Sequence, residues 1–479
     1  MEYTEFCAKF CEIEARYKLF DLEFNEIKYW KYARYYVFNI LGQKLYDLSV
    51  PFWLDTENPW KLPRYSHQYQ KYTDAIFHNV NLTSEKDIML FTFQRRVKYK
   101  KKFISPVTDE ISLHLQRSHC IIEEPYCEGY YRPTPIRNIK YYDVWEGIGD
   151  ETKVYTPINR GQLRKQLLHT FEQEYDITFT QSEKKNIISN LNYYIMYHDE
   201  LVAKYMKILS RIRPKVVIYT SSYIGIRVVL TEVLKELNIP CIEILHGYVD
   251  DNCIAYNYSE TGMNDSLPDY IFAYSQVQKD TLNWGIPRDH IRGVGNPWLE
   301  KRSKKFLAER GEKRNKKRIT FISSANPAIE KYLVHLADHI DQDDYEIIFK
   351  LHPEEYALWK KVYQDLPDHV KVIDNNDKDI HYYLANSDFV AGITSTALFE
   401  AAVYPVQIYI LAEESWQSMH ILLNAGRASL IQDCRELYSS IMNDQNKNNK
   451  IDCNFYAENA IDNINTEIEK IIREGEKEC

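Results

Sequence analysis

The sequence predicts an α/β protein with two doubly wound, Rossmann-like domains and a helix-rich N-terminal extension. The main observation is an alternation of short apolar segments, typical of buried strands, with longer helical segments. This alternation runs through residues 215–297, pauses at a basic stretch, and restarts over residues 318–411. The second observation is length, because 479 residues exceed what one ordinary hydrophobic core organises. Consecutive strand–helix–strand units predict parallel strands joined by right-handed crossovers.

The N-terminal part is predicted to be helical at its start and irregular further on. Over residues 1–48, aromatic and aliphatic residues recur at intervals of three and four, and prolines follow at positions 51, 59 and 63. Residues 87–93 have the composition of a buried strand, whereas residues 103–160 contain several prolines and no clear period. Helices are predicted over residues 161–175 and 181–212.

The elements of the two domains follow in order. In the first, predicted strands and helices alternate at 215–220, 221–237, 239–245, 270–275 and 276–284, and 291–297 closes the domain. In the second, the predicted strands are 318–324, 345–353, 370–374, 388–394 and 406–411, and the predicted helices are 328–340, 354–366, 379–387 and 395–404. A last helix is predicted over 465–478. The resulting domains are residues 1–297 and 298–450, with 451–479 as a helical tail.

Composition narrows the class of protein. Hydrophobic residues make up 44% and charged residues 27%, as in folded globular chains, and a net charge of −9 argues against general nucleic-acid binding. With no apolar run of about 18 residues and no signal-peptide core, we expect a cytoplasmic protein. Nine irregularly spaced cysteines without a Cys-x-x-Cys pair predict reduced thiols. No histidine cluster or strand-end Asp-x-Asp triplet has metal-ligand spacing, so no metal is expected.

Two basic stretches interrupt this acidic chain. One is "RRVKYKKK" at residues 95–102 and the other is "KRSKKFLAERGEKRNKKR" at residues 301–318. Each is interpreted either as a solvated surface or linker, or as a patch that contacts anionic lipid head groups or a lipid-diphosphate acceptor.

Polar residues follow the predicted strands of the second domain, where ligands collect in open parallel sheets. Residues 394–396 form a Thr-Ser-Thr sequence at a strand-to-helix turn. One hydroxyl would cap the helix, worth about 1 kcal/mol, but three exceed that need and suit a phosphate at a helix N-terminus. Glu400 lies one turn into the helix, where its carboxylate can accept hydrogen bonds from ribose hydroxyls.

The preceding strand ends in a lysine and a histidine. Lys350 and His352 are two residues apart, so their side chains point to the same side, and Pro353 ends the strand. The lysine would supply fixed positive charge, and the histidine could protonate a leaving group near neutral pH. The alternative is a solvated lysine and a histidine that caps the sheet edge.

Taken together, "KLHP" (350–353) and "TSTALFEA" (394–401) resemble the C-terminal halves of bacterial capsule and O-antigen glycosyltransferases of the GT-B type. Similar motifs occur in the sialyl- and Kdo-transferases that use CMP-sugars and in the CDP-glycerol glycerophosphotransferases of teichoic-acid synthesis. Two further segments are similar to segments of such transferases. One is the stretch from 219 to 248, which ends in "LHGY", and the other is "VGNPWLE" (294–300). The resemblance spans residues 210–410.

The resemblance implies a GT-B fold whose two domains face a cleft, with residues 1–297 on the acceptor side and residues 298–450 binding the donor nucleotide. It implies that His246 is the base for the acceptor hydroxyl or a phosphate contact, with Asp250 as an alternative base or as its orienter, and that His352 is also catalytic. Gly247 is expected to permit a tight turn after His246. The residues expected to bind the donor are Lys350, Thr394, Ser395, Thr396, Glu400, Ser323, Ser324 and Asn296.

The expected activity is transfer of a sugar from a nucleotide donor, with cytidine favoured as its base, to a capsule, O-antigen or lipid-linked glycan. The alternatives are a CDP-polyol phosphotransferase, a UDP-sugar 2-epimerase and a non-catalytic glycan-binding scaffold. The expected partners are the nucleotide sugar, the glycan acceptor and, through the basic stretches, the inner face of the membrane.

Overall fold

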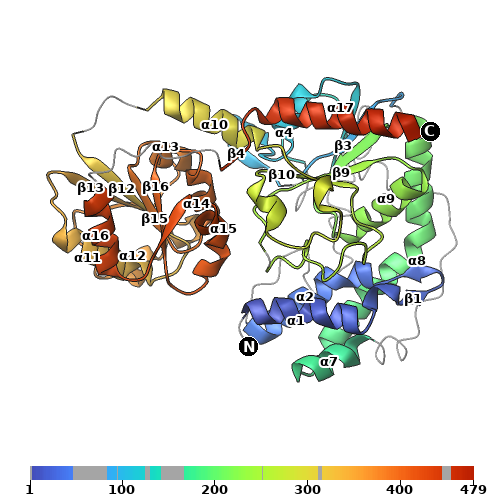
Figure 1. Cartoon of the computed structure of the whole chain (residues 1–479), viewed down its shortest axis with the longest axis horizontal. Helices are drawn as coiled ribbons and strands as arrows, with labels where there is room; N and C mark the ends of the chain where they lie inside the picture. The colour runs from blue at the N-terminus through green and yellow to red at the C-terminus, as the bar shows by residue number, and fades with distance from the viewer. Residues whose placement is uncertain are drawn as a thin grey trace. The chain divides into compact units, whose positions relative to one another are not determined.

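The computed structural model describes residues 3–46, 83–93, 95–124, 130–141, 167–250, 252–310, 315–444 and 455–478. The chain forms two compact units (Figure 1). Unit 1 comprises Met1–Ala273, Leu282–Arg292 and Ile461–Cys479, and unit 2 comprises Tyr274–Thr281 and Gly293–Ala460. Each unit has its own sheet with parallel strand pairs, which confirms the prediction of two doubly wound domains.

Unit 1 is built on a seven-stranded sheet in the order β11-β10-β9-β8-β3-β6-β7. Its strands are β3 (Ile88–Phe91), β6 (His119–Glu123), β7 (Ile139–Tyr141), β8 (Val216–Tyr219), β9 (Cys241–Ile244), β10 (Tyr270–Ala273) and β11 (Ile291–Gly293). Neighbouring strands from β7 through to β10 pair in parallel. The chain adds β6 and β7 on one side of β3 and then returns to its other side with β8. Winding therefore reverses between β3 and β8, the point at which such sheets bind ligands outside their strand ends.

Helices surround this sheet, and two small hairpins, β1–β2 (Glu23–Phe24 and Ile27–Lys28) and β4–β5 (Val97–Tyr99 and Lys102–Ile104), lie apart from it. The helices of unit 1 are α1 (Tyr3–Arg16), α2 (Trp30–Tyr46), α4 (Asp109–His114), α7 (His169–Tyr175), α8 (Gln181–Ile212), α9 (Gly225–Glu236) and α17 (Ala460–Glu478), with 3-10 turns at Leu19–Asp21 and Arg288–His290. The predicted helical N-terminus is confirmed, and its buried aromatic residues, among them Phe6, Phe10 and Trp30, belong to the core of unit 1.

The longest helix shows how local sequence sets these elements. Thr180 begins α8 with a capping box, in which its hydroxyl accepts from the Glu183 N–H and the Glu183 carboxylate accepts from the Thr180 N–H. Arg213 ends α8 in the left-handed conformation directly before Pro214. The apolar stripe of α8 is buried in the unit 1 core.

Unit 2 is built on a six-stranded parallel sheet in the order β14-β13-β12-β15-β16-β17. Its strands are β12 (Lys317–Ile322), β13 (Tyr345–Lys350), β14 (Lys371–Ile373), β15 (Phe389–Gly392), β16 (Gln407–Leu411) and β17 (Ala428–Ile431). The chain adds β13 and β14 on one side of β12 and then β15, β16 and β17 on the other. The winding reverses between β12 and β15, which makes their carboxyl ends the expected ligand position.

Helices pack on both faces of this second sheet. They are α10 (Pro297–Ala308), α11 (Ile329–His339), α12 (Trp359–Val362), α13 (Ile380–Ala385), α14 (Thr396–Ala401), α15 (His420–Asn424) and α16 (Cys434–Asp444), with 3-10 turns η5 (Val277–Asp280), η7 (Pro353–Glu355) and η8 (Trp416–Met419). On one face, apolar residues of α11 and α16 form a core with alternate residues of the strands, such as Ile319 and Phe321 on β12. α13 contacts both α10 and α14.

Several predicted elements differ from the structure. The stretch from 103 to 160, expected to be loop-rich, contributes α4, β6 and β7, and the predictions did not include α16 or β17. The predicted helix 276–284 is only the turn η5, because the buried Gln278 amide accepts a hydrogen bond from the Tyr274 N–H and holds a tight turn. The predicted helix 354–366 is reduced to η7 and α12, and Leu358, 54% exposed, does not pack in the core.

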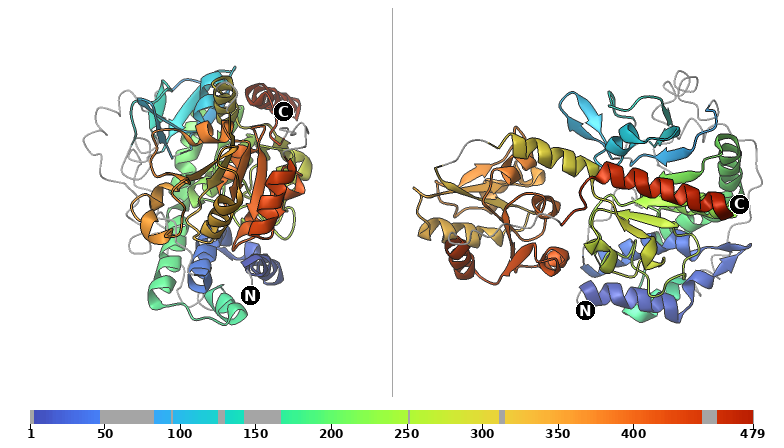
Figure 2. Two further views of the ribbon diagram at one scale, coloured as in Figure 1. Left: turned by 90° about the vertical axis from the view of Figure 1, so that its left-hand side faces the viewer. Right: turned by 45° about the horizontal axis from the view of Figure 1, so that its top comes forward.

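The C-terminal segment does not form a separate tail. Helix α17, red in Figures 1 and 2, lies in unit 1 and pairs there through Glu467 with Arg292 and through Glu469 with Arg117. The residues just before it belong to unit 2, where the Ala457 N–H donates to the Tyr274 carbonyl. The boundary expected after residue 297 therefore lies before Gly293, and the boundary expected before residue 451 lies after Ala460. Among the described helices, none combines the length and the apolarity that a membrane span requires.

Candidate functional site

The carboxyl edge of the unit 2 sheet carries the hydroxyl groups expected to bind the donor. Ile322 and Gly392, the last residues of β12 and β15, are paired across these neighbouring strands. Ser323 and Ser324 therefore follow one strand where Ile393, Thr394 and Ser395 follow the strand beside it. The structure therefore places four of the predicted residues together at the reversal of winding.

These hydroxyls have two kinds of environment. Ser323 is buried and its Oγ accepts from the Ala325 N–H at 3.2 Å, and the Ser395 Oγ caps α14 by accepting from the Ala397 N–H at 3.3 Å. By contrast, Ser324 and Thr394 are half-buried, Thr396 is exposed, and none has a side-chain hydrogen bond among the described residues. Ser323 and Ser395 thus shape the turns, while Ser324, Thr394 and Thr396 offer hydroxyls to a ligand.

Lys350 lies at the end of β13, on the side of the sheet that leads to β14. Its ammonium donates to the Leu351 carbonyl at 3.2 Å, to the Tyr356 hydroxyl at 2.5 Å and to the Asn375 carbonyl at 3.1 Å. These three bonds use all three of its hydrogens and tie β13 to the following loops. Burial lowers the pKa of Lys350 to about 8. A phosphate contact by Lys350 stays a prediction, and it would require one of these bonds to be released.

His352 and Asn296 also have local structural roles. The His352 Nδ1 accepts from the Glu354 N–H at 3.4 Å and begins η7, and the imidazole ring is exposed. The Asn296 side chain caps α10 by accepting from the Leu299 N–H at 3.1 Å. The sequence anticipated neither cap, and the catalytic role of His352 and the donor contact of Asn296 remain predictions.

Glu400 belongs to a polar cluster that the sequence did not reveal. Its Oε2 lies 3.5 Å from the His381 Nε2, and the His381 Nδ1 is 2.9 Å from the Tyr404 hydroxyl. Desolvation, and then the charge of Asp379, raise the pKa of Glu400 to about 7, while burial lowers the pKa of His381 to about 4. The buried Arg302 forms an ion pair with Asp379. Near neutral pH, Glu400 can therefore either donate or accept a hydrogen bond.

The carboxyl edge of the unit 1 sheet carries His246, which follows β9. Its ring stacks on Phe93, which follows β3, with centroids 5.0 Å apart and planes at 21°. The Nδ1 atom is buried and has no hydrogen-bond partner among the residues that the structure describes. Burial lowers the pKa of His246 to about 4, so the ring is neutral at pH 7 and can accept a proton. Gly247 has no positive φ and no atom within 4 Å of an added Cβ, so the turn does not require a glycine.

Asp250 and Glu243 flank His246 in sequence but differ in environment. The Asp250 Oδ1 accepts from the Asn252 N–H at 3.0 Å and shapes its own loop, and Asp251 lies outside the described residues. Glu243, on β9, is fully buried, and its Oε1 accepts from the Tyr256 hydroxyl at 2.5 Å and the Ser222 N–H at 3.2 Å. Burial raises the pKa of Glu243. Glu243 thereby anchors the β8–α9 loop. The sequence did not predict this role, because Glu243 lies within an otherwise apolar strand.

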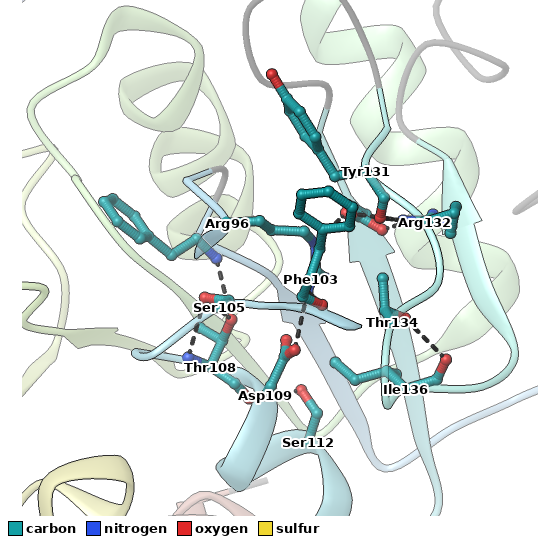
Figure 3. A network of polar contacts seen from close by, with 12 residues as sticks. Arg96, Phe103, Ser105, Thr108, Asp109, Ser112, Tyr131, Arg132, Thr134 and Ile136 are labelled. Atoms are coloured by element: carbon teal, nitrogen blue, oxygen red, sulfur yellow. Dashed lines mark hydrogen bonds and ion pairs between the residues drawn. The ribbon is translucent and has the colours of Figure 1, made fainter. Parts of the chain in front are cut away.

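A buried charge network lies at the ends of β3 and β6 (Figure 3). The Arg96 guanidinium donates to Glu123 at 2.5 Å and to Asp109 at 2.8 Å, and Arg132 donates to the other Glu123 oxygen at 2.7 Å. Burial raises the pKa of Asp109 to about 6 in spite of Arg96. Beside it, Glu124 pairs with Arg227 at 2.7 Å.

This network brings carboxylates that are far apart in sequence to one strand end. Asp109, Glu123 and Glu124 lie in the stretch from 103 to 160, for which the sequence predicted no element, and their arginine partners gave no sequence signal. Among the described residues, no group of three or more His, Cys, Asp or Glu side chains is arranged to hold a metal ion. The absence of a metal requirement stays a prediction.

The neutral state of His246 has a measurable consequence for stability. The pKa of an unperturbed histidine is 6.5, and that of His246 in the folded chain is about 4. Between these values the unfolded state binds more protons, so acidification favours unfolding. From pH 7 to pH 4.5 the wild type should lose about 2 to 3 kcal/mol more unfolding free energy than His246→Phe, which keeps a ring against Phe93.

Denaturant titrations at both pH values measure this difference. Equal pH dependence in wild type and His246→Phe would show that His246 is not held neutral.

Comparison with known proteins finds likeness of fold. No family model matches the sequence, and no curated protein sequence does. The UDP-GlcNAc 2-epimerase of Methanocaldococcus jannaschii is 13% identical, with a TM-score of 0.46, and the alignment covers 80% of this chain and 99% of that one. The UDP-GlcNAc 2-epimerase of Neisseria meningitidis, bound to UDP-GlcNAc, is 12% identical with a TM-score of 0.45 over 80% and 99%. The kitacinnamycin glycotransferase is 10% identical with a TM-score of 0.41 over 82% and 96%.

Proposed function

We propose that the chain is an enzyme that acts on a nucleotide-activated sugar, and specifically a metal-independent glycosyltransferase of the GT-B type. The observation that carries the proposal is the set of hydroxyls without partners among the described residues, Ser324, Thr394 and Thr396, at the reversal of winding in unit 2. Hydroxyls and free backbone N–H groups at such a strand end suit the phosphate of a nucleotide. Glu400, one turn further along and with a pKa of about 7, is the proposed contact for the ribose hydroxyls.

Unit 1 supplies the acceptor-side chemistry in this proposal. His246 is neutral at pH 7 and its buried Nδ1 has no partner among the described residues, so the imidazole can take the proton of an acceptor hydroxyl. The acceptor oxygen then forms a bond to the anomeric carbon as the bond from that carbon to the nucleotide phosphate breaks. The nucleotide leaves with the bonding electron pair. His352, exposed beside Glu354, is the proposed proton donor to that phosphate.

The donor is proposed to be a CMP-sugar, and the acceptor a capsule, O-antigen or lipid-linked glycan. Thermal unfolding with CMP, CDP, UDP and GDP tests the donor, because a ligand at about a hundredfold its Kd stabilises a fold by about 2.7 kcal/mol. Thr394→Val keeps the side-chain shape and removes the hydroxyl. It should weaken nucleotide binding roughly 10- to 100-fold, as expected for a hydrogen bond to a charged group.

A matched control is Thr261→Val, an exposed threonine of unit 1, which should leave nucleotide affinity unchanged. If no nucleotide stabilises the chain, the glycan-binding scaffold replaces this proposal. Inversion of a UDP-sugar at C2 without any acceptor would identify the epimerase alternative. Incorporation of phosphate into a polymer would identify the polyol-phosphate transferase.

A further inference from the structure

The β4–β5 hairpin presents an unusual concentration of positive charge. Its strands pair antiparallel, with Val97 opposite Ile104 and Tyr99 opposite Lys102, and Lys100 takes a positive φ of 55° in the turn. Five cations within eight residues are exposed, and no acidic residue lies between positions 95 and 104. These hairpin cations are Arg95, Lys98, Lys100, Lys101 and Lys102.

None of the hairpin cations forms an ion pair within the part of the chain that the structure describes, which sets them apart from the second basic stretch. On α10 and beyond, cations are matched by acids: Lys304 pairs with Glu300, and Lys305 lies 3.8 Å from Glu309. Arg318 pairs with Glu346 at 2.7 Å. These three cations of the 301–318 stretch are thus paired within unit 2, whereas the hairpin cations are available to a partner.

The hairpin is attached to a rigid base. Arg96 lies between the exposed Arg95 and Val97, but its side chain is buried and pairs with Asp109 and Glu123 (Figure 3). The Phe103 N–H donates to the Pro133 carbonyl at 2.8 Å. These contacts fix the base of the hairpin while its lysines extend into solvent.

The hairpin is amphipathic as well as basic. Val97 is 36% exposed, and the half-buried Tyr99 ring lies 5.6 Å from the Lys100 ammonium. An exposed apolar side chain and a half-buried aromatic ring beside lysines suit the boundary between lipid head groups and acyl chains. A fully hydrated polyanion would leave these apolar groups in water, so the combination favours a lipid surface.

We propose that the β4–β5 hairpin docks the protein on a membrane surface that carries anionic phospholipid head groups. The inference is independent of the proposed function, because it rests on the hairpin alone. The net charge of −9 means that the chain as a whole is not attracted to such a surface, so the cluster of hairpin cations supplies a local attraction that orients the protein. The free energy gained should decrease with ionic strength, since exposed charges are screened by salt.

Sedimentation of the full chain with vesicles tests this docking surface. We expect binding to vesicles of equal parts phosphatidylcholine and phosphatidylglycerol, and none to phosphatidylcholine alone. The variant Lys98→Ala/Lys101→Ala/Lys102→Ala should lower the partition coefficient about a hundredfold, because each lysine near an anionic surface contributes roughly a factor of five. The control Lys304→Ala/Lys305→Ala removes two lysines of the paired stretch and should bind as the wild type does.

The same melting temperature in all three proteins shows that the substitutions, at exposed positions except for the half-buried Lys305, leave the fold intact. Equal binding to both kinds of vesicle, or wild-type binding by the triple variant, would overturn the proposal. A third arm uses soluble polyphosphate: binding of polyphosphate through the hairpin without binding to vesicles would assign the surface to a soluble polyanion and also overturn it.

Discussion

Replacing Arg96 with methionine is expected to lower the unfolding free energy of unit 1 by about 3 to 5 kcal/mol, the usual cost of removing one partner from a buried ion pair. The side chains of Arg96, Asp109 and Glu123 are only 1–3% exposed. Methionine fills much of the volume but leaves Asp109 without its cation and Glu123 with only Arg132. The remaining carboxylates must then take up protons or admit water.

Denaturant unfolding, combined with hydrogen exchange at the amides of β3 and β6, measures this effect in the unit concerned. Lys98→Met is the matched control, because Lys98 is two residues away and exposed, and such surface changes usually stay within about 0.5 kcal/mol. If Arg96→Met and Lys98→Met were equally stable, the network would not be the buried, paired structure seen in Figure 3.

Gly295→Ala is expected to destabilise unit 2 by about 3 kcal/mol, from left-handed backbone strain and overpacking together. Gly295 has a φ of +95°, and an added Cβ would lie 2.3 Å from the Ala457 carbonyl oxygen and 2.8 Å from the Ala460 Cβ. The backbone of residues 457–460 would have to move away. The hydrogen bond from the Ala457 N–H to the Tyr274 carbonyl would then weaken.

Substitutions at two other glycines separate the effect of backbone strain from the effect of overpacking. Gly426 has a φ of +66° with open space around it, so Gly426→Ala reports backbone strain alone and should cost about 1 kcal/mol. Gly247→Ala has neither strain nor a close neighbour and should be nearly neutral. Hydrogen exchange at the Ala457 amide locates the change. A Gly295→Ala variant no less stable than Gly426→Ala would refute the close approach to Ala457.

Alternation along the chain was enough to predict the doubly wound units, because their longer strands are short, mostly apolar segments that alternate with helices. Strand β12 and helix α11 are examples, within one residue or two of their predicted ends. The same reasoning missed β6 and β7, which have five and three residues and lie among prolines without a period. It overextended the helix after Pro353, where local caps formed by His352 and Glu355 hold a single turn.

The residues of the candidate site were predictable from the sequence where polar side chains come directly after a strand. Ser323, Ser324 and Thr394 were expected at strand ends, and the parallel pairing of β12 with β15 puts these ends next to each other. The sequence could not show that the Lys350 ammonium is already bonded to three oxygen atoms, or that His381 lies against Glu400. Those partners are supplied by other segments of unit 2.

The amino-acid sequence by itself determined the type of fold and the positions where strands give way to polar residues, because both depend on local patterns of apolar and hydroxyl side chains. Only the tertiary structure decided which polar groups are already engaged. It paired Arg96 with Asp109 and Glu123, left the His246 Nδ1 without a partner among the described residues, and separated the exposed hairpin cations from the matched cations of α10. The burial of a polar side chain and its hydrogen-bond partners are set by chain segments that are distant in sequence. These two properties determine the charge and pKa of the side chain and whether it can bind a ligand.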